Sequence, residues 1–133
     1  CMRTRRQMSD YLTKKGYTQA VCDYVLERLE YHNLIDDAAY CRAYINSVKG
    51  KGKRALEADL IKRGAEKNAI SEALDEVEED SGEAAVILEK YMRGKQHDKQ
   101  NLYKAFKYLL AKGYGYDTAK DALGKFGDTD EDY

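Results

Sequence analysis

The chain has 133 residues and a net charge of −1; hydrophobic residues make up 43% of it and charged residues 35%. This composition is too apolar for a disordered chain and too charged for a membrane protein, and no apolar run approaches the roughly 20 residues that a membrane helix needs. Because no apolar signal-peptide core follows the basic N-terminal residues, we expect a cytoplasmic protein that does not bind membranes.

The spacing of apolar residues is helical along the whole chain, and no segment alternates with the period of two that is typical of strands. We therefore predict an all-α fold. The expected helices, in chain order, cover residues 4–15, 19–32, 37–49, 53–63, 67–79, 83–93, 98–112 and 116–126.

One short signature recurs three times along these helices. It reads Leu, two residues, a basic residue and Gly, and it ends at Gly16, Gly64 and Gly113, which are 48 and 49 residues apart. A basic residue complements the negative end of a helix, and Gly can take the positive φ that closes it. A period of this length predicts tandem three-helix repeats, the last one shortened, in a curved, elongated array. We place the repeats at 1–50, 51–95 and 96–127, followed by an acidic tail at 128–133 that we expect to be frayed or disordered.

Asp36 and Asp37 open the third predicted helix, directly after the apolar Leu34 and Ile35. Asp is a preferred residue at a helix N-cap, and a carboxylate in the first turn is favoured by the helix dipole. We therefore expect Asp36 to cap this helix and Asp37 to lie in its first turn.

Basic residues gather between the third and fourth predicted helices and beyond, and Gly50 and Gly52 make that junction flexible. Residues 1–64 hold 13 Lys and Arg against 8 Asp and Glu, whereas residues 65–133 hold 10 against 16. The cluster is either a solvated face or a surface for an acidic protein or a polyanion. The candidate partner-binding residues are Arg42, Lys49, Lys51, Lys53, Arg54, Lys62, Arg63, Lys14 and Lys15.

The sequence offers no pattern for catalysis or for a cofactor. His32 and His97 lack a second ligand at a strong metal spacing, and no serine lies in a nucleophile elbow. The odd cysteine count, Cys1, Cys22 and Cys41, argues against a disulfide framework, and we expect Cys22 and Cys41 to be core residues. We predict a protein that is not an enzyme and holds neither metal nor cofactor.

The order and spacing of several motifs resemble the RecX family over about residues 3 to 126. The similar segments are Arg3-Thr4 with Met8, Leu12 and Lys15-Gly16-Tyr17; Leu34-Ile35-Asp36-Asp37 with Tyr40 and Tyr44; Gly50-Lys51-Gly52-Lys53-Arg54 with Leu60 and Arg63-Gly64; and Tyr108-Leu109-Leu110-Ala111-Lys112-Gly113-Tyr114.

The resemblance implies a regulator, without catalytic residues, that binds the RecA filament on DNA and inhibits it in recombination and DNA repair. We expect the protein to be a monomer. Direct contact with DNA is then at most weak. Two other hypotheses stay open at this point: a helical nucleic-acid-binding module that acts without RecA, and a structural scaffold for some other protein.

Overall fold

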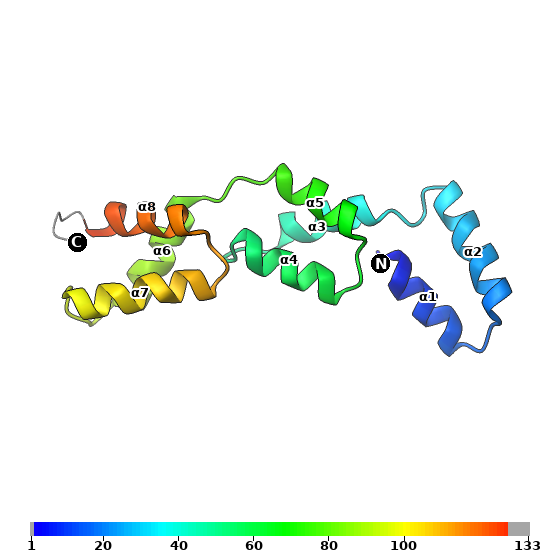
Figure 1. Cartoon of the computed structure of the whole chain (residues 1–133), viewed down its shortest axis with the longest axis horizontal. Coiled ribbons are helices and arrows are strands. Elements are labelled where there is room, and N and C mark those ends of the chain that lie inside the picture. The colour runs from blue at the N-terminus through cyan, green and yellow to red at the C-terminus, as the bar shows by residue number, and fades with distance from the viewer. Residues whose placement is uncertain (1, 128–133) are drawn as a thin grey trace. The chain divides into compact units, whose positions relative to one another are not determined.

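The computed structural model describes residues 2–127, and these fold into eight α-helices with no strand among them (Figure 1). The all-α prediction is thus confirmed. The predicted acidic tail at 128–133 lies outside the described residues. The helices are α1 (Arg5–Lys14), α2 (Gln19–Tyr31), α3 (Asp37–Ser47), α4 (Lys53–Lys62), α5 (Lys67–Asp75), α6 (Ser81–Met92), α7 (Lys99–Ala111) and α8 (Tyr116–Gly127).

Local chemistry sets most helix ends. Thr4 forms a capping box with Gln7 at the start of α1, and Asp36 accepts a hydrogen bond from the Ala39 N–H at the start of α3, as predicted. The three signature glycines all have positive φ, between +85° and +97°, which confirms that they close their helices.

The end of α5 differs from the prediction. We expected this helix to reach residue 79, but it ends at Asp75, so that Val77 follows the helix instead of extending its apolar stripe. The next residues include Glu76, Glu78 and Glu79, and carboxylates are unfavourable at the negative end of a helix. Asp80 then caps α6 by accepting hydrogen bonds from two backbone N–H groups, so α6 begins at Ser81, two residues earlier than expected.

The chain forms two compact units, each with its own core. Unit 1 consists of the described residues up to Val48 together with Glu57–Glu76, and unit 2 consists of Lys49–Leu56 together with the described residues from Val77 onward. The core of unit 1 includes Leu12, Cys22, Leu26 and Ile35, and that of unit 2 includes Ala84, Leu88, Met92, Ala105, Leu109 and Tyr114. Cys22 and Cys41 are buried free thiols, which confirms their core assignment, and Cys1 lies outside the described residues.

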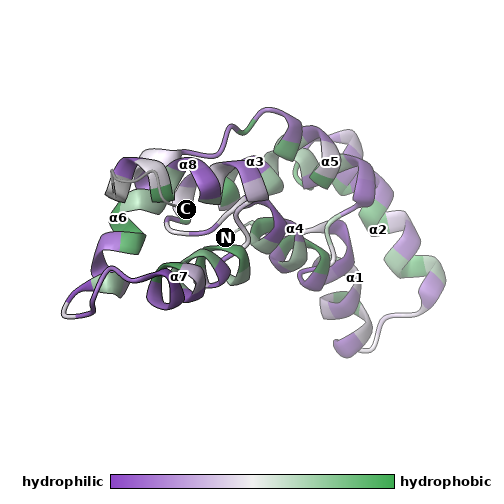
Figure 2. Cartoon of the chain, turned by 60° about the vertical axis from the view of Figure 1, so that its left-hand side comes forward, coloured by the Kyte–Doolittle hydropathy of each residue, from purple (hydrophilic) through white to green (hydrophobic). Residues whose placement is uncertain are grey.

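The third helix of a sequence repeat packs on helices of the following repeat. In unit 1, α3 packs on α5, and in unit 2, α6 lies across both α7 and α8 (Figure 1). The helices carry both hydrophobic and hydrophilic residues along their length (Figure 2), and the buried hydrophobic ones form the cores. The third helix of one sequence repeat is therefore buried by the helices of the next repeat.

Candidate partner-binding surface

Asp37 ties two helix starts together inside unit 1. Its carboxylate accepts a hydrogen bond from the N–H of Arg5, the first residue of α1, at 2.9 Å. It accepts a second from the N–H of Glu66, the N-cap residue of α5, at 2.8 Å. Helix N-termini carry unsatisfied N–H groups and partial positive charge, so one carboxylate can stabilise both. Asp37 lies in the first turn of α3, as predicted, but it also joins three helices from two successive sequence repeats.

Glu79 makes the equivalent connection in unit 2. Its carboxylate accepts from the N–H of Lys53, the first residue of α4, at 2.7 Å and from the N–H of Gly115, just before α8, at 2.9 Å. Lys53 lies 48 residues after Arg5, and Gly115 lies 49 residues after Glu66. We call Asp37 and Glu79 the clasp acids, because each holds the first helix of one repeat to the second helix of the next.

The environment of Glu79 favours its charged form. Burial raises the pKa of this carboxyl, but hydrogen bonds from the Gly115 N–H, the Thr118 side chain and the Lys53 N–H outweigh it, and the pKa is lowered overall. The positive charge of Lys53 acts in the same direction. Glu79 is therefore an anion at neutral pH and holds the start of α4 in place.

Two of the three signature glycines, Gly64 and Gly113, lie at the same junctions. Gly113 is packed so tightly that a Cβ added there would lie 2.4 Å from the backbone nitrogen of Ala55. The Gly52 N–H donates to the Lys112 carbonyl at 3.0 Å, and the Arg54 N–H donates to the Gly113 carbonyl at 3.1 Å. In unit 1 the Thr4 hydroxyl donates to the Arg63 carbonyl at 3.1 Å. The start of one repeat's first helix thus docks on the end of the next repeat's first helix.

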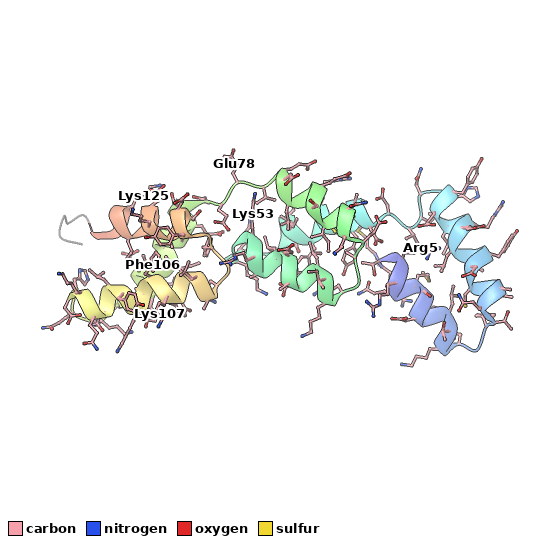
Figure 3. The ribbon with its side chains drawn as sticks, in the orientation of Figure 1. Arg5, Lys53, Glu78, Phe106, Lys107 and Lys125 are labelled. Carbon is pink, nitrogen blue, oxygen red and sulfur yellow. The ribbon has the colours of Figure 1, made fainter. Side chains whose placement is uncertain are left out.

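Four of the nine candidate basic residues lie at one of these junctions. Lys49 and Lys51 are exposed in the segment between α3 and α4. Lys53, which is labelled in Figure 3, and Arg54 open α4; Lys53 is half-buried and Arg54 is exposed. All four belong to unit 2. We call them the junction cations. The hydrogen bonds of the Lys53 and Arg54 N–H groups hold the backbone of these two residues in place.

The other five candidates belong to unit 1 and are exposed, and they lie at different helix ends or faces. Lys14 and Lys15 are at the end of α1, Arg42 is on α3, and Lys62 and Arg63 are at the end of α4. The nine candidate residues are therefore divided between the two units, four in unit 2 and five in unit 1.

Arg63 is already engaged within unit 1. Its guanidinium donates to the Tyr40 hydroxyl at 2.9 Å and lies 4.4 Å from the centre of the Tyr44 ring. The Tyr44 hydroxyl in turn donates to the Asp59 carboxylate at 2.7 Å. The hydrogen bond with Tyr40 is the main reason why the pKa of Arg63 is raised. Arg63 therefore has a structural role in addition to any role toward a partner.

The described residues offer neither a metal site nor a membrane-spanning helix. Across residues 2–127, no group of three His, Cys, Asp or Glu side chains is placed as a metal site would require. Nor does this part of the chain contain a helix that is both long and apolar enough to cross a membrane.

The sequence did not predict that Asp37 also joins α1 to α5, nor that Glu79 joins α4 to α8. The acidic run Glu78-Glu79-Asp80 was the available signal.

Comparisons with known proteins agree on one family. The model described as the first three-helix domain of RecX matches residues 1–29, and that of the second three-helix domain matches residues 36–74. The regulatory protein RecX of Mycobacterium sp. (strain KMS) is 32% identical over 133 residues, which cover 91% of this chain and 72% of that protein. The regulatory protein RecX of Clostridium botulinum (strain Eklund 17B / Type B) is 30% identical over 129 residues, covering 92% of this chain.

Solved structures share the fold. The crystal structure of RecX from Lactobacillus salivarius superposes with a TM-score of 0.89 at 22% identity, covering 95% of this chain and 86% of that one. A second crystal structure of regulatory protein RecX gives a TM-score of 0.81 and covers 90% of this chain. The chain spans 61% of the length of the clostridial relative.

Proposed function

The chain belongs to the RecX family of regulatory proteins, and from this membership we propose that it binds the RecA filament on DNA and inhibits its activity in recombination and repair. The action is by binding, with no catalytic step, and takes place in the cytoplasm. The protein acts as a monomer, and its direct contact with DNA is weak.

The observation that carries the proposal furthest is the placement of the junction cations. A repeat protein offers a long surface with little core, which suits a partner that is itself a helical polymer. The glycines predicted a flexible junction, but the start of α4 is held in place by the clasp acid Glu79 and by backbone bonds to Lys112 and Gly113. Because the backbone of Lys53 and Arg54 is already held, binding to an acidic surface costs conformational entropy chiefly in the side chains. We therefore place the principal contact with the filament at Lys49, Lys51, Lys53 and Arg54.

The test measures co-sedimentation of the protein with RecA filaments on single-stranded DNA. The double variant Lys51→Glu and Arg54→Glu reverses two exposed charges, and binding should weaken by at least about tenfold, or 1.4 kcal/mol. Adding Lys53→Glu should weaken binding further, but it places a carboxylate beside Glu79, so helix content must be checked by circular dichroism.

The matched control is Lys67→Glu with Lys104→Glu, which reverses two exposed lysines elsewhere in the chain. The control should bind filaments as the unmodified protein does. Equal binding by the junction variant would move the contact to another surface. Failure of the unmodified protein to bind filaments, or to slow ATP hydrolysis by RecA at micromolar concentration, would refute the proposed function.

Binding to DNA alone separates this proposal from the nucleic-acid alternative. A module that binds DNA by itself should show an affinity that falls steeply with salt, because each phosphate contact releases counterions. We expect weak binding to single- and double-stranded DNA without RecA. Tight, salt-sensitive binding in the absence of RecA would favour the alternative.

A further inference from the structure

Unit 2 contains an apolar groove between α7 and α8, with a volume of about 790 Å³. Leu102, Phe106 and Leu123 give it an apolar floor, and Phe106, labelled in Figure 3, meets the ring of Tyr116 edge-on at 5.3 Å. The remaining lining residues are Lys99, Tyr103, Lys120 and Gly124. Tyr103 and Tyr116 are 62% and 60% exposed, so large aromatic surfaces remain in water.

The repeats themselves show that folding does not require these apolar residues. When the repeats are aligned on Gly16, Gly64 and Gly113, three groove positions are charged or polar in both earlier repeats. Tyr103 corresponds to Arg6 and Arg54, Phe106 to Ser9 and Glu57, and Tyr116 to Gln19 and Lys67. The first two repeats form the same helices with polar residues there. The apolar groove is therefore a feature that only the third repeat carries.

Gly124 gives a second and independent indication. It lies inside α8, where Gly costs about 0.5–1 kcal/mol relative to Ala. Within the described part of the chain, no heavy atom comes within 4 Å of a Cβ placed on Gly124, so internal packing does not explain the residue. The corresponding residues are Glu27 and Asp75. A glycine that lines a groove allows a second backbone to approach closely.

The charges of the residues that line the groove indicate which kind of partner can bind there. Lys99 and Lys120 stand at its rim, and no carboxylate is among the described residues that line it. An amphipathic helix can insert apolar side chains at i, i+3, i+4 and i+7 while its carboxylates meet the two lysines. A helix can turn its carboxylates toward Lys99 and Lys120 and away from the exposed Asp117 and Asp121 of α8. A nucleic acid fits less well, because its affinity comes mainly from evenly spaced phosphates, which would meet both aspartates, and only two cations line the groove.

We propose that the groove between α7 and α8 is a docking site for an amphipathic, acidic helix of a partner protein. Its apolar side chains fill the floor formed by Leu102, Phe106 and Leu123. Its backbone passes close to Gly124, and its acidic flank pairs with Lys99 and Lys120. This site is separate from the junction cations and goes beyond the proposed action on RecA.

The test uses the full chain and a synthetic 20-residue helix with Leu and Phe on one face and Glu on the other. Two matched peptides carry Lys in place of Glu, or the same residues in scrambled order. Fluorescence anisotropy should show the acidic peptide binding at least about tenfold tighter than either. Amide NMR shifts should change chiefly in α7 and α8. Equal binding of all three peptides, or shifts confined to other helices, would overturn the proposal.

Two variants probe the groove without removing core residues. Gly124→Leu fills it, and Tyr116→Lys installs the residue found at the same position in the second repeat. Each should weaken binding of the acidic peptide by about tenfold or more while circular dichroism stays unchanged. The control Tyr24→Lys alters an equally exposed tyrosine on α2 and should leave binding intact.

Binding that survives both groove variants would refute the site. So would a 20-residue oligothymidylate that displaces the acidic peptide and shifts the same amides, because the groove would then be a nucleic-acid site. Neither result bears on RecA, since the junction cations are tested separately and on a different part of unit 2.

Discussion

Two single carboxylates connect helices of successive repeats in this protein. Asp37 and Glu79 each accept two backbone N–H groups that belong to helices of successive repeats. A neutral amide in place of either carboxylate keeps one acceptor oxygen but turns its NH2 group toward the second N–H. The pairing is therefore lost at one helix start even though the side chain keeps its size.

Glu79→Gln should destabilise the protein at pH 7 by about 1–3 kcal/mol, the usual cost of leaving a hydrogen-bonding group without its partner. The folded pKa of Glu79 lies below the ordinary value of 4.5, so its charge stabilises the fold above that pH. This stability is lost as the pH falls from about 4.5 through the lower folded pKa. Urea unfolding from pH 7 to pH 3 should show the unmodified protein losing more stability than Glu79→Gln.

The matched control for this titration is Glu27→Gln, which changes an exposed carboxylate on α2. Its stability should follow that of the unmodified protein across the same pH range. Parallel pH profiles for the unmodified protein and Glu79→Gln would show that folding does not lower the pKa of Glu79, and would contradict the clasp.

At the scale of the helices, the three signature glycines share a conformation but differ in their surroundings. A Cβ on Gly113 would lie 2.4 Å from the Ala55 backbone nitrogen, and one on Gly64 would lie 2.7 Å from the flexible end of Arg6. Around Gly16, the described residues leave open space within 4 Å. Comparing a Gly→Ala substitution at these positions therefore distinguishes the cost of backbone strain from the cost of disturbing the contact between helices.

Replacing each of these glycines by Ala should destabilise the protein in the order Gly113, Gly64, Gly16. All three variants bear the strain of a left-handed residue, about 1–2 kcal/mol. Gly113→Ala should cost about 1–3 kcal/mol more, because the backbone of α4 must move. Midpoints of urea unfolding give the order. Equal losses for Gly113→Ala and Gly16→Ala would show that the close approach at Ala55 contributes nothing to stability.

The elements themselves were predictable because each is encoded locally. Apolar spacing placed all eight helices, and the signature glycines and Asp36 marked their ends. The early end of α5 was not predicted, since Glu79 leaves the helical pattern to meet Lys53 and Gly115, which are distant in sequence. Periodicity also shows which face of α3 is apolar, but not that α5 of the next repeat covers it.

The candidate site was less predictable than the fold. Counting charges along the chain predicts nine basic residues as one candidate surface, but a count of charges cannot show that four of them belong to one unit and five to the other. Residues 65–133 have an acidic charge balance as a whole, but α7 within them has three lysines and no Asp or Glu. A charge count over the whole half does not show this local difference. The groove beside α7 became visible only when its lining residues were known.

At the scale of the whole molecule, α4 is shared between the two units. Its first turn, through Leu56, belongs to unit 2, and the residues from Glu57 onward belong to unit 1. A helix of 10 residues is too short to persist in water without packing, since isolated helices under about 12–15 residues are marginal. We therefore expect α4 to be stable only when both units are folded.

Hydrogen exchange of the amides of Glu57–Lys62 tests this dependence. Leu26→Ala removes a buried side chain from the core of unit 1, and Leu88→Ala does the same in unit 2, each at a cost of about 2–5 kcal/mol. Both variants should speed exchange in α4, whereas exchange in α1 should rise only with Leu26→Ala and exchange in α8 only with Leu88→Ala. The surface variant Tyr24→Ala should change none of the three helices. If Leu88→Ala leaves the amides of Glu57–Lys62 fully protected, α4 depends on unit 1 alone, and the two units are stabilised separately.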